Sequence, residues 1–149
     1  MCLRVGANDV MRRLSALVSA CILLAGCGRN LPELVPVSGR VLFDGGLPPA
    51  AGVVHFMPIE SAGHVPRRPG MGRFGLDGRF EVESFNGMKG LVPGRYNVRI
   101  ECFSHEPAAA PGEYEKASYV PAGYRPPELV IKPGQRRVDD LLYDVPKKK

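Results

Sequence analysis

Glycine and proline punctuate the whole chain, and they constrain its fold more than any other feature. The 149 residues include 18 glycines and 15 prolines, spread without a collagen-like period. This density interrupts long helices and favours short strands joined by turns. A chain of this length has room for one domain, which can bury a core without disulfides or metals. The expected fold class is therefore all-β.

Between the turns, apolar and polar residues alternate with a period of two, as in half-buried strands. The clearest run follows Pro93-Gly94 and places on one face Tyr96, Val98, Ile100 and Cys102. Leu76-Asp77-Gly78-Arg79 predicts a hairpin. Further strands are expected over 37–43, 53–57 (ended by Pro58), 72–74, 80–83, 129–131 and 141–145. About seven short strands and no convincing helix after the leader indicate a single β-sandwich.

The N-terminal segment predicts a secretory signal peptide over residues 1–26. Arg12 and Arg13 precede a short apolar run, Leu14 to Leu24, and small residues follow it. The run is shorter than the roughly 20 apolar residues of a membrane-spanning helix. Met11 is a second candidate start, because Met11-Arg12-Arg13 is itself a complete positive region.

The end of this leader, Leu24-Ala25-Gly26-Cys27, resembles the lipobox of bacterial lipoproteins. The resemblance implies that Leu24, Ala25 and Gly26 position the cleavage site and that the thiol of Cys27 carries the lipid. The competing interpretation is an ordinary signal with an accidental cysteine. Two or three acyl chains would anchor the protein stably to a membrane of the bacterial cell envelope. Residues 27–36 would then form a short polar tether.

Several motifs occur in order along the rest of the chain: Val37-Ser38-Gly39-Arg40-Val41, Val54-His55-Phe56, Asp77-Gly78-Arg79-Phe80, Pro93-Gly94-Arg95-Tyr96 and Val120-Pro121-Ala122-Gly123-Tyr124. Together they resemble the transthyretin-like, carboxypeptidase regulatory-like domain of small bacterial lipoproteins, over residues 37–146. The resemblance implies a Greek-key, prealbumin-like sandwich with no established activity. Hydroxyisourate hydrolases of that group end in Tyr-Arg-Gly-Ser. This chain ends Val145-Pro146-Lys147-Lys148-Lys149, so that activity is not expected.

The sequence predicts no enzyme, metal centre or cofactor. It contains no Gly-x-Ser-x-Gly, HExxH, P-loop or GxGxxG motif. The three histidines, His55, His64 and His105, have no metal-ligand spacing. Glu81 and Glu83 are expected on the polar face of a strand. Asp139-Asp140 lacks the further oxygen ligands of a calcium loop.

Cys102 is expected to be a buried small hydrophobe, because the leader removes Cys2 and Cys21 and the lipid occupies Cys27. Gly39 and Gly94 are expected at positions where a side chain would be in the way or a positive φ is required, and the hydroxyl of Tyr96 should need a partner. The long connection from Ser104 to Pro127 could be a binding element or loose packing, with equal weight.

Net charge does not indicate a nucleic-acid partner. The formal charge is +5, but the three C-terminal lysines supply all the surplus that remains once the leader is removed. No basic stripe interleaved with aromatics is present. Residues 147–149 are expected to be a solvated basic tail.

The expected function is a non-enzymatic, membrane-anchored module of the cell envelope. It would bind an unidentified protein or polysaccharide through loops at the ends of the sandwich, since loops on a rigid scaffold suit recognition. The alternative is a passive structural component of the envelope. A hydrolase with an unrecognised site is a third, less favoured possibility.

Overall fold

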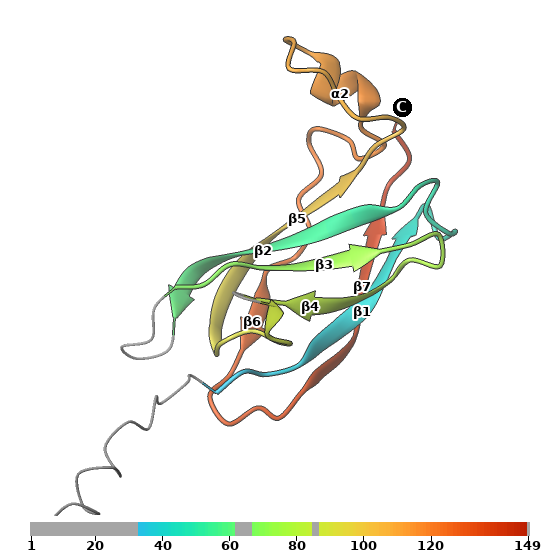
Figure 1. Cartoon of the computed structure of the whole chain (residues 1–149). Helices are drawn as coiled ribbons and strands as arrows, with labels where there is room; N and C mark the ends of the chain where they lie inside the picture. Colours follow the sequence, from blue (N-terminus) through green and yellow to red (C-terminus); the bar gives the residue numbers. More distant parts are fainter. Residues whose placement is uncertain (1–32, 62–66, 85–86, 149) are drawn as a thin grey trace, which may run out of the picture. The chain divides into compact units, whose positions relative to one another are not determined.

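The structure is a computed structural model that describes residues 33–61, 67–84 and 87–148 (Figure 1). Cys27, the lipobox and His64 lie outside these residues. Seven strands and one short helix make up the described part: β1 (Val37–Phe43), β2 (Gly52–Ser61), β3 (Gly70–Phe74), β4 (Arg79–Glu83), β5 (Gly94–Cys102), α2 (Glu113–Ala117), β6 (Leu129–Ile131) and β7 (Val138–Val145). The all-β prediction is confirmed. No described helix is long and apolar enough to cross a membrane.

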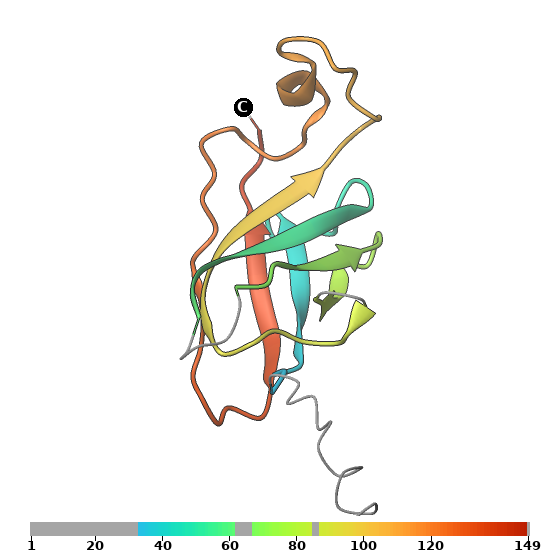
Figure 2. The same cartoon turned by 60° about the vertical axis from the view of Figure 1, so that its left-hand side comes forward.

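The strands form one seven-stranded sheet in the order β6-β5-β2-β3-β4-β1-β7. Every neighbouring pair is antiparallel except β1 and β7, which are parallel. The sheet curls like a barrel, so that β5 and β2 lie across the core from β1 and β7 (Figures 1 and 2). Since β6 pairs only with Gly94 to Tyr96, the second half of β5 has no strand on its outer side in the described part of the chain.

The core lies inside the curl and follows the predicted alternation. Val54 and Phe56 of β2 are fully buried, and Tyr96 and Cys102 are at most 1% exposed. Phe80 connects opposite walls, because its ring centroid lies 6.2 Å from that of Phe56 and 6.3 Å from that of Tyr143 on β7. The strand faces assigned from the sequence are therefore correct at these positions.

Two further expectations about single residues are met. A β-carbon built on Gly39 would lie 2.7 Å from Cβ of Leu141 and 2.8 Å from Cζ of Phe80, closer than real contacts allow. Glycine at this position therefore lets β1 approach β7 and β4. The buried hydroxyl of Tyr96 donates a 2.6 Å hydrogen bond to the carbonyl of Val92, which supplies the partner that a buried phenol needs.

The structure differs from the sequence prediction at Pro58, which lies inside β2 instead of ending it. The β2–β3 pairing stops at Phe56, and the β2–β5 register shifts between Pro58 and Glu60. Proline is tolerated where a strand has lost a neighbour or contains a bulge, because the missing N–H then removes no ladder hydrogen bond.

Segments expected to be irregular are also more ordered than the sequence suggests. Val35, placed in the tether, is 1% exposed and exchanges two backbone hydrogen bonds with Leu91. The long connection contains α2. Lys148 of the basic tail donates from Nζ to the carbonyl oxygens of Glu115 and Ser118. Lys148 is exposed, as a solvated tail predicts, but these two carbonyls hold its ammonium group.

Candidate functional site

The connection between β5 and β6 folds back along the free edge of β5. The amide of Tyr119 donates to the carbonyl of Cys102 (2.9 Å), and the amide of Ser104 donates to the carbonyl of Ala117 (2.9 Å). Between these bonds lies α2, which begins after Gly112 at φ 79°, a left-handed conformation that glycine adopts readily. An ion pair of 2.7 Å between Glu113 and Lys116 spans the single turn. The expected loop is thus pinned to the strand that precedes it.

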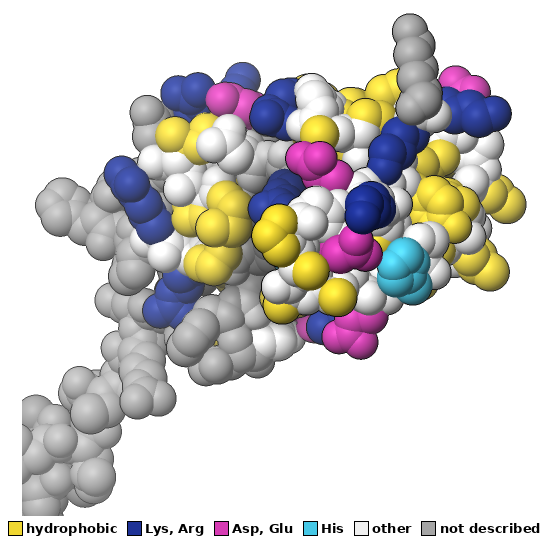
Figure 3. Space-filling view, turned by 90° about the horizontal axis from the view of Figure 1, so that it is seen from above, with side chains coloured by type: hydrophobic (Ala, Val, Ile, Leu, Met, Phe, Trp, Pro, Cys, Tyr) yellow, Lys and Arg dark blue, Asp and Glu magenta, His cyan; other side chains and the backbone are white. Residues whose placement is uncertain are grey.

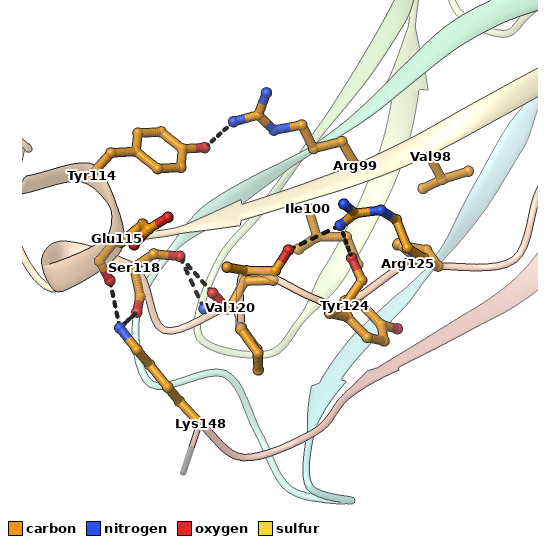
Figure 4. Close-up of a pocket in the computed structure, with 13 residues that line it drawn as sticks. Val98, Arg99, Ile100, Tyr114, Glu115, Ser118, Val120, Tyr124, Arg125 and Lys148 are labelled. Carbon is orange, nitrogen blue, oxygen red and sulfur yellow. Dashed lines mark hydrogen bonds between the residues drawn. The ribbon is translucent and has the colours of Figure 1, made fainter. Parts of the chain in front are cut away.

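A pocket of about 520 Å³ opens between this connection and the second half of β5 (Figure 4). Its floor is apolar, because the buried side chains of Val98 and Ile100 line it from β5. The connection supplies most of the walls, and the C-terminal segment supplies one residue. The full lining is Val98, Arg99, Ile100, Tyr114, Glu115, Ser118, Val120, Pro121, Ala122, Tyr124, Arg125, Pro126 and Lys148.

Three sets of hydrogen bonds hold the walls in place. The hydroxyl of Tyr124 donates to the carbonyl of Asp144 on β7 (3.0 Å). Ser118 closes a tight turn, because its hydroxyl donates to the carbonyl of Val120 and accepts from the amide of Val120. Lys148 binds the carbonyl of Ser118 at 3.0 Å. The connection is therefore tied both to β5 and to the C-terminal strand, and the pocket lies between the two ties.

The rim of the pocket is mainly cationic. Arg99, Arg125 and Lys148 line it, against one acidic residue, Glu115. Figure 4 shows the guanidinium of Arg125 between the connection and β5, and its Nη1 donates to the carbonyls of Ala122 and Tyr124, both at 3.0 Å. An apolar floor below a basic rim suits a ligand that has an apolar body and hydrogen-bond acceptors or negative charge at its edge.

A polar network supports the back of the pocket on the outer face of the sheet. Tyr114 of α2 accepts from Nη2 of Arg99 and donates to Oε1 of Glu101 (3.0 Å). The Arg99 guanidinium lies 5.3 Å from the centre of the Tyr114 ring, and Phe103 packs edge-on against the same ring at 4.9 Å. These contacts fix the position of α2 on β5.

The pKa values of the two tyrosines that line the pocket are both raised. Burial raises the pKa of Tyr124, and the nearby Asp144 carboxylate raises it further. Burial also raises the pKa of Tyr114, with a smaller opposing effect from its hydrogen bond to Arg99. Both phenols therefore stay protonated at neutral pH and act as hydrogen-bond donors.

The residues singled out from the sequence do not converge on this pocket. His55 lies on β2, where its buried Nε2 is 3.2 Å from Oε2 of Glu101, at ion-pair distance but outside hydrogen-bond geometry. His105 contacts the hydroxyl of Ser104 at 2.9 Å. Glu81 and Glu83 are on the outer face of β4, as expected. Within residues 33–61, 67–84 and 87–148, no three His, Cys, Asp or Glu side chains are grouped closely enough to hold a metal ion.

The structure also explains the positions of Asp139 and Asp140 without a bound ligand. Asp139 accepts hydrogen bonds from Arg137 (2.7 Å) and from the hydroxyl of Ser38 (3.0 Å). The bond from Arg137 is the main reason that the pKa of Asp139 is lowered, and the bond from Ser38 adds to it. Asp140 has a positive φ of 57° at the irregular start of the β1–β7 pairing.

Sequence reasoning missed the residues that build the pocket. From the sequence, Lys148 is only part of a basic tail, and Arg125 and Tyr114 belong to no motif. Tyr124 is only the last residue of Val120-Pro121-Ala122-Gly123-Tyr124. One signal was available, since an aromatic residue within a Pro/Gly-rich connection is a candidate anchor.

Seen from above, the surface intersperses basic and acidic side chains, with apolar side chains exposed between them (Figure 3). A mixed surface of this kind is typical of soluble domains and does not by itself distinguish a partner. Comparisons of the chain with models of known protein families, with curated proteins and with solved structures found no match.

Proposed function

We propose that this chain is a lipid-anchored lipoprotein of the bacterial cell envelope that binds a protein or polysaccharide partner in the pocket beneath residues 104–127. One observation carries the binding role. The connection is tied to β5 through Tyr119 and to β7 through Tyr124, and a pocket with an apolar floor lies between these ties. A loosely packed connection would not be expected to form these hydrogen bonds or to enclose a pocket.

The anchor rests on the sequence. A positively charged segment, an apolar run and Leu24-Ala25-Gly26-Cys27 stand in the order that lipoprotein processing requires. Only about eight residues separate Cys27 from Val35, the first buried residue among those that the structure describes. An extended chain of that length reaches at most about 28 Å. The proposed partner is therefore one that can lie close to a membrane surface.

We further propose that the domain is a Greek-key, prealbumin-like sandwich of the transthyretin-like group. The ordered motifs of the sequence support this assignment, and the curled, all-β sheet is compatible with it. The role we propose is non-enzymatic, because the polar side chains of the pocket are used to hold its walls. Tyr124, Arg125 and Lys148 each donate to backbone carbonyls.

The anchor can be tested by mass spectrometry of the mature N-terminus. We expect cleavage before Cys27 and acyl chains on that residue, and Cys27→Ser should prevent both. An unmodified N-terminal amine, or cleavage at another residue in the wild-type protein, would contradict the proposed anchor.

The binding role can be tested by site-specific photocrosslinking in intact cells. A photoreactive residue at position 122, which lines the pocket, should capture one defined protein or polysaccharide. The same residue at position 47, which is 64% exposed and does not line the pocket, should not. Arg125→Gln should reduce the capture at position 122. Equal capture from both positions, or capture unaffected by Arg125→Gln, would favour the alternative of a passive structural component.

A further inference from the structure

Three arginines on the outer face of the sheet have no acidic partner among the described residues. Arg40 lies on β1, Arg73 on β3 and Arg79 on β4. All three side chains point away from the core, because their neighbours Val41, Phe74 and Phe80 are buried. In the described part of the chain, none of the three guanidinium groups has a hydrogen bond or an ion pair. The three strands that carry them are neighbours in the sheet, in the order β3-β4-β1.

The strand register brings these arginines together. Arg40 is directly opposite Arg79 in the antiparallel β1–β4 pair. Gly72 is opposite Val82, so the next pair places Arg73 beside Glu81, two residues along the same face from Arg79. Directly opposed side chains have β-carbons about 5 Å apart, and like charges in such a pair destabilise a sheet. The fold thus holds two positive charges in a position that costs free energy.

The nearby acidic groups do not cancel this charge. Glu81 is bonded to Lys89 at 3.0 Å, so that pair is already neutral. Asp139 is bonded to Arg137 and Ser38. Asp140 is the remaining acidic residue that lines the hollow of about 630 Å³ containing all three arginines. With three cations and one carboxylate that is not in an ion pair, the hollow has a net positive charge.

We propose that Arg40, Arg73 and Arg79 form a binding site for a phosphate group, carried either by a phospholipid headgroup or by a soluble phosphate ester. The planar guanidinium offers two parallel N–H donors that match two phosphate oxygens, and two opposed arginines can grip one tetrahedral anion from both sides. A bound anion also removes the repulsion between Arg40 and Arg79. The site is separate from the pocket beneath residues 104–127 and does not depend on its function.

The test uses the purified full-length protein, with inorganic phosphate as the probe in isothermal titration calorimetry. Arg40→Gln and Arg79→Gln should each weaken binding at least tenfold. Arg40→Lys should weaken it as well, because lysine keeps the charge but lacks the two-pronged donor. The matched control is Arg136→Gln, which removes an exposed arginine outside the hollow. A second readout is thermal unfolding, in which phosphate should stabilise the wild type and Arg136→Gln but not Arg40→Gln.

A vesicle experiment distinguishes the two sources of phosphate. Protein that begins at Gly28, and therefore lacks both the leader and the proposed lipid but keeps every residue that the structure describes, is sedimented with vesicles of phosphatidylglycerol or phosphatidylcholine. Sedimentation with phosphatidylglycerol alone, lost in Arg40→Gln, would identify a headgroup. Phosphate binding that depends on Arg40 without such sedimentation would identify a soluble ester. The proposal is overturned if neither occurs, or if Arg136→Gln weakens binding as much as Arg40→Gln. Arg40→Lys keeps the test decisive should Arg40→Gln fail to fold.

Discussion

The hydroxyl of Tyr124 is the contact that most directly ties the connection over the pocket to the rest of the sheet. It donates to the carbonyl of Asp144 on β7, 20 residues away in sequence, at 3.0 Å. Tyr124→Phe deletes this one hydrogen bond and keeps the ring that packs against the core. We expect the variant to fold normally and to release residues 120–126 from β7 more often than the wild type.

The magnitude follows from the exposure of the bond. A hydrogen bond contributes about 0.5–1.5 kcal/mol net, and the full penalty of an unsatisfied group arises only where water cannot replace the donor. Because this bond lies at an exposed position, water can reach the Asp144 carbonyl, and a loss of about 1 kcal/mol is expected. That corresponds to roughly a fivefold increase in opening of the connection and a fall of about 4 °C in Tm for a domain of this size.

Hydrogen exchange of the amides from Tyr119 to Tyr124, alongside thermal unfolding, measures this effect. Tyr119→Phe is the matched control, since Tyr119 also packs against the core but its hydroxyl makes no hydrogen bond with any described residue. Exchange should accelerate in Tyr124→Phe and stay unchanged in Tyr119→Phe. If both variants behave alike, or if Tyr124→Phe changes only the exchange of core strands, the hydroxyl does not hold the wall of the pocket.

Three other predictions test the fold. Gly39→Ala should destabilise the protein by about 1–3 kcal/mol in denaturant unfolding, because the added methyl would overlap Leu141 and Phe80; an unchanged midpoint would refute the close approach. Cys102 should resist thiol reagents until the protein unfolds, because it is fully buried and burial raises its pKa; rapid native labelling would contradict this. Burial raises the pKa of Tyr143 to about 12. Its contribution to the free energy of unfolding is therefore complete below the unfolded pKa near 10 and is lost as pH rises towards 12, by about 2–3 kcal/mol. The free energy of unfolding of Tyr143→Phe should therefore fall less between pH 10 and 12 than that of the wild type. Identical pH profiles of the two proteins would argue against burial of the phenol.

The faces of the strands could be predicted from the sequence because they depend on local order. Successive side chains of a strand point to opposite sides, so the run from Tyr96 to Cys102 already specified which residues enter the core. Turn chemistry is local in the same way. Asp77-Gly78 lies in the turn between β3 and β4, with Gly78 at φ 74°, where a side chain would be strained.

Boundaries were harder to predict, because tertiary pairing decides them. Val35 is indistinguishable from a tether residue until Leu91 lies beside it and exchanges backbone hydrogen bonds. Pro58 normally ends a strand, yet β2 continues through it because β5 still pairs with the other side. Neither partner can be inferred from a neighbourhood of a few residues, since each lies dozens of positions away.

The sequence by itself determined the all-β class, the inward residues, the hairpin at Asp77-Gly78 and the burial of Cys102. Only the tertiary structure decided that the seven strands join one curled sheet. It also decided that residues 104–127, and not a strand, lie beside the second half of β5. It also decided that Lys148 reaches Ser118 and that Arg40 faces Arg79. The physical reason is the separation in sequence between the residues on which each feature depends. Periodicity and turns depend on residues within one strand or hairpin, whereas a pocket and a charge cluster depend on which distant strands become neighbours.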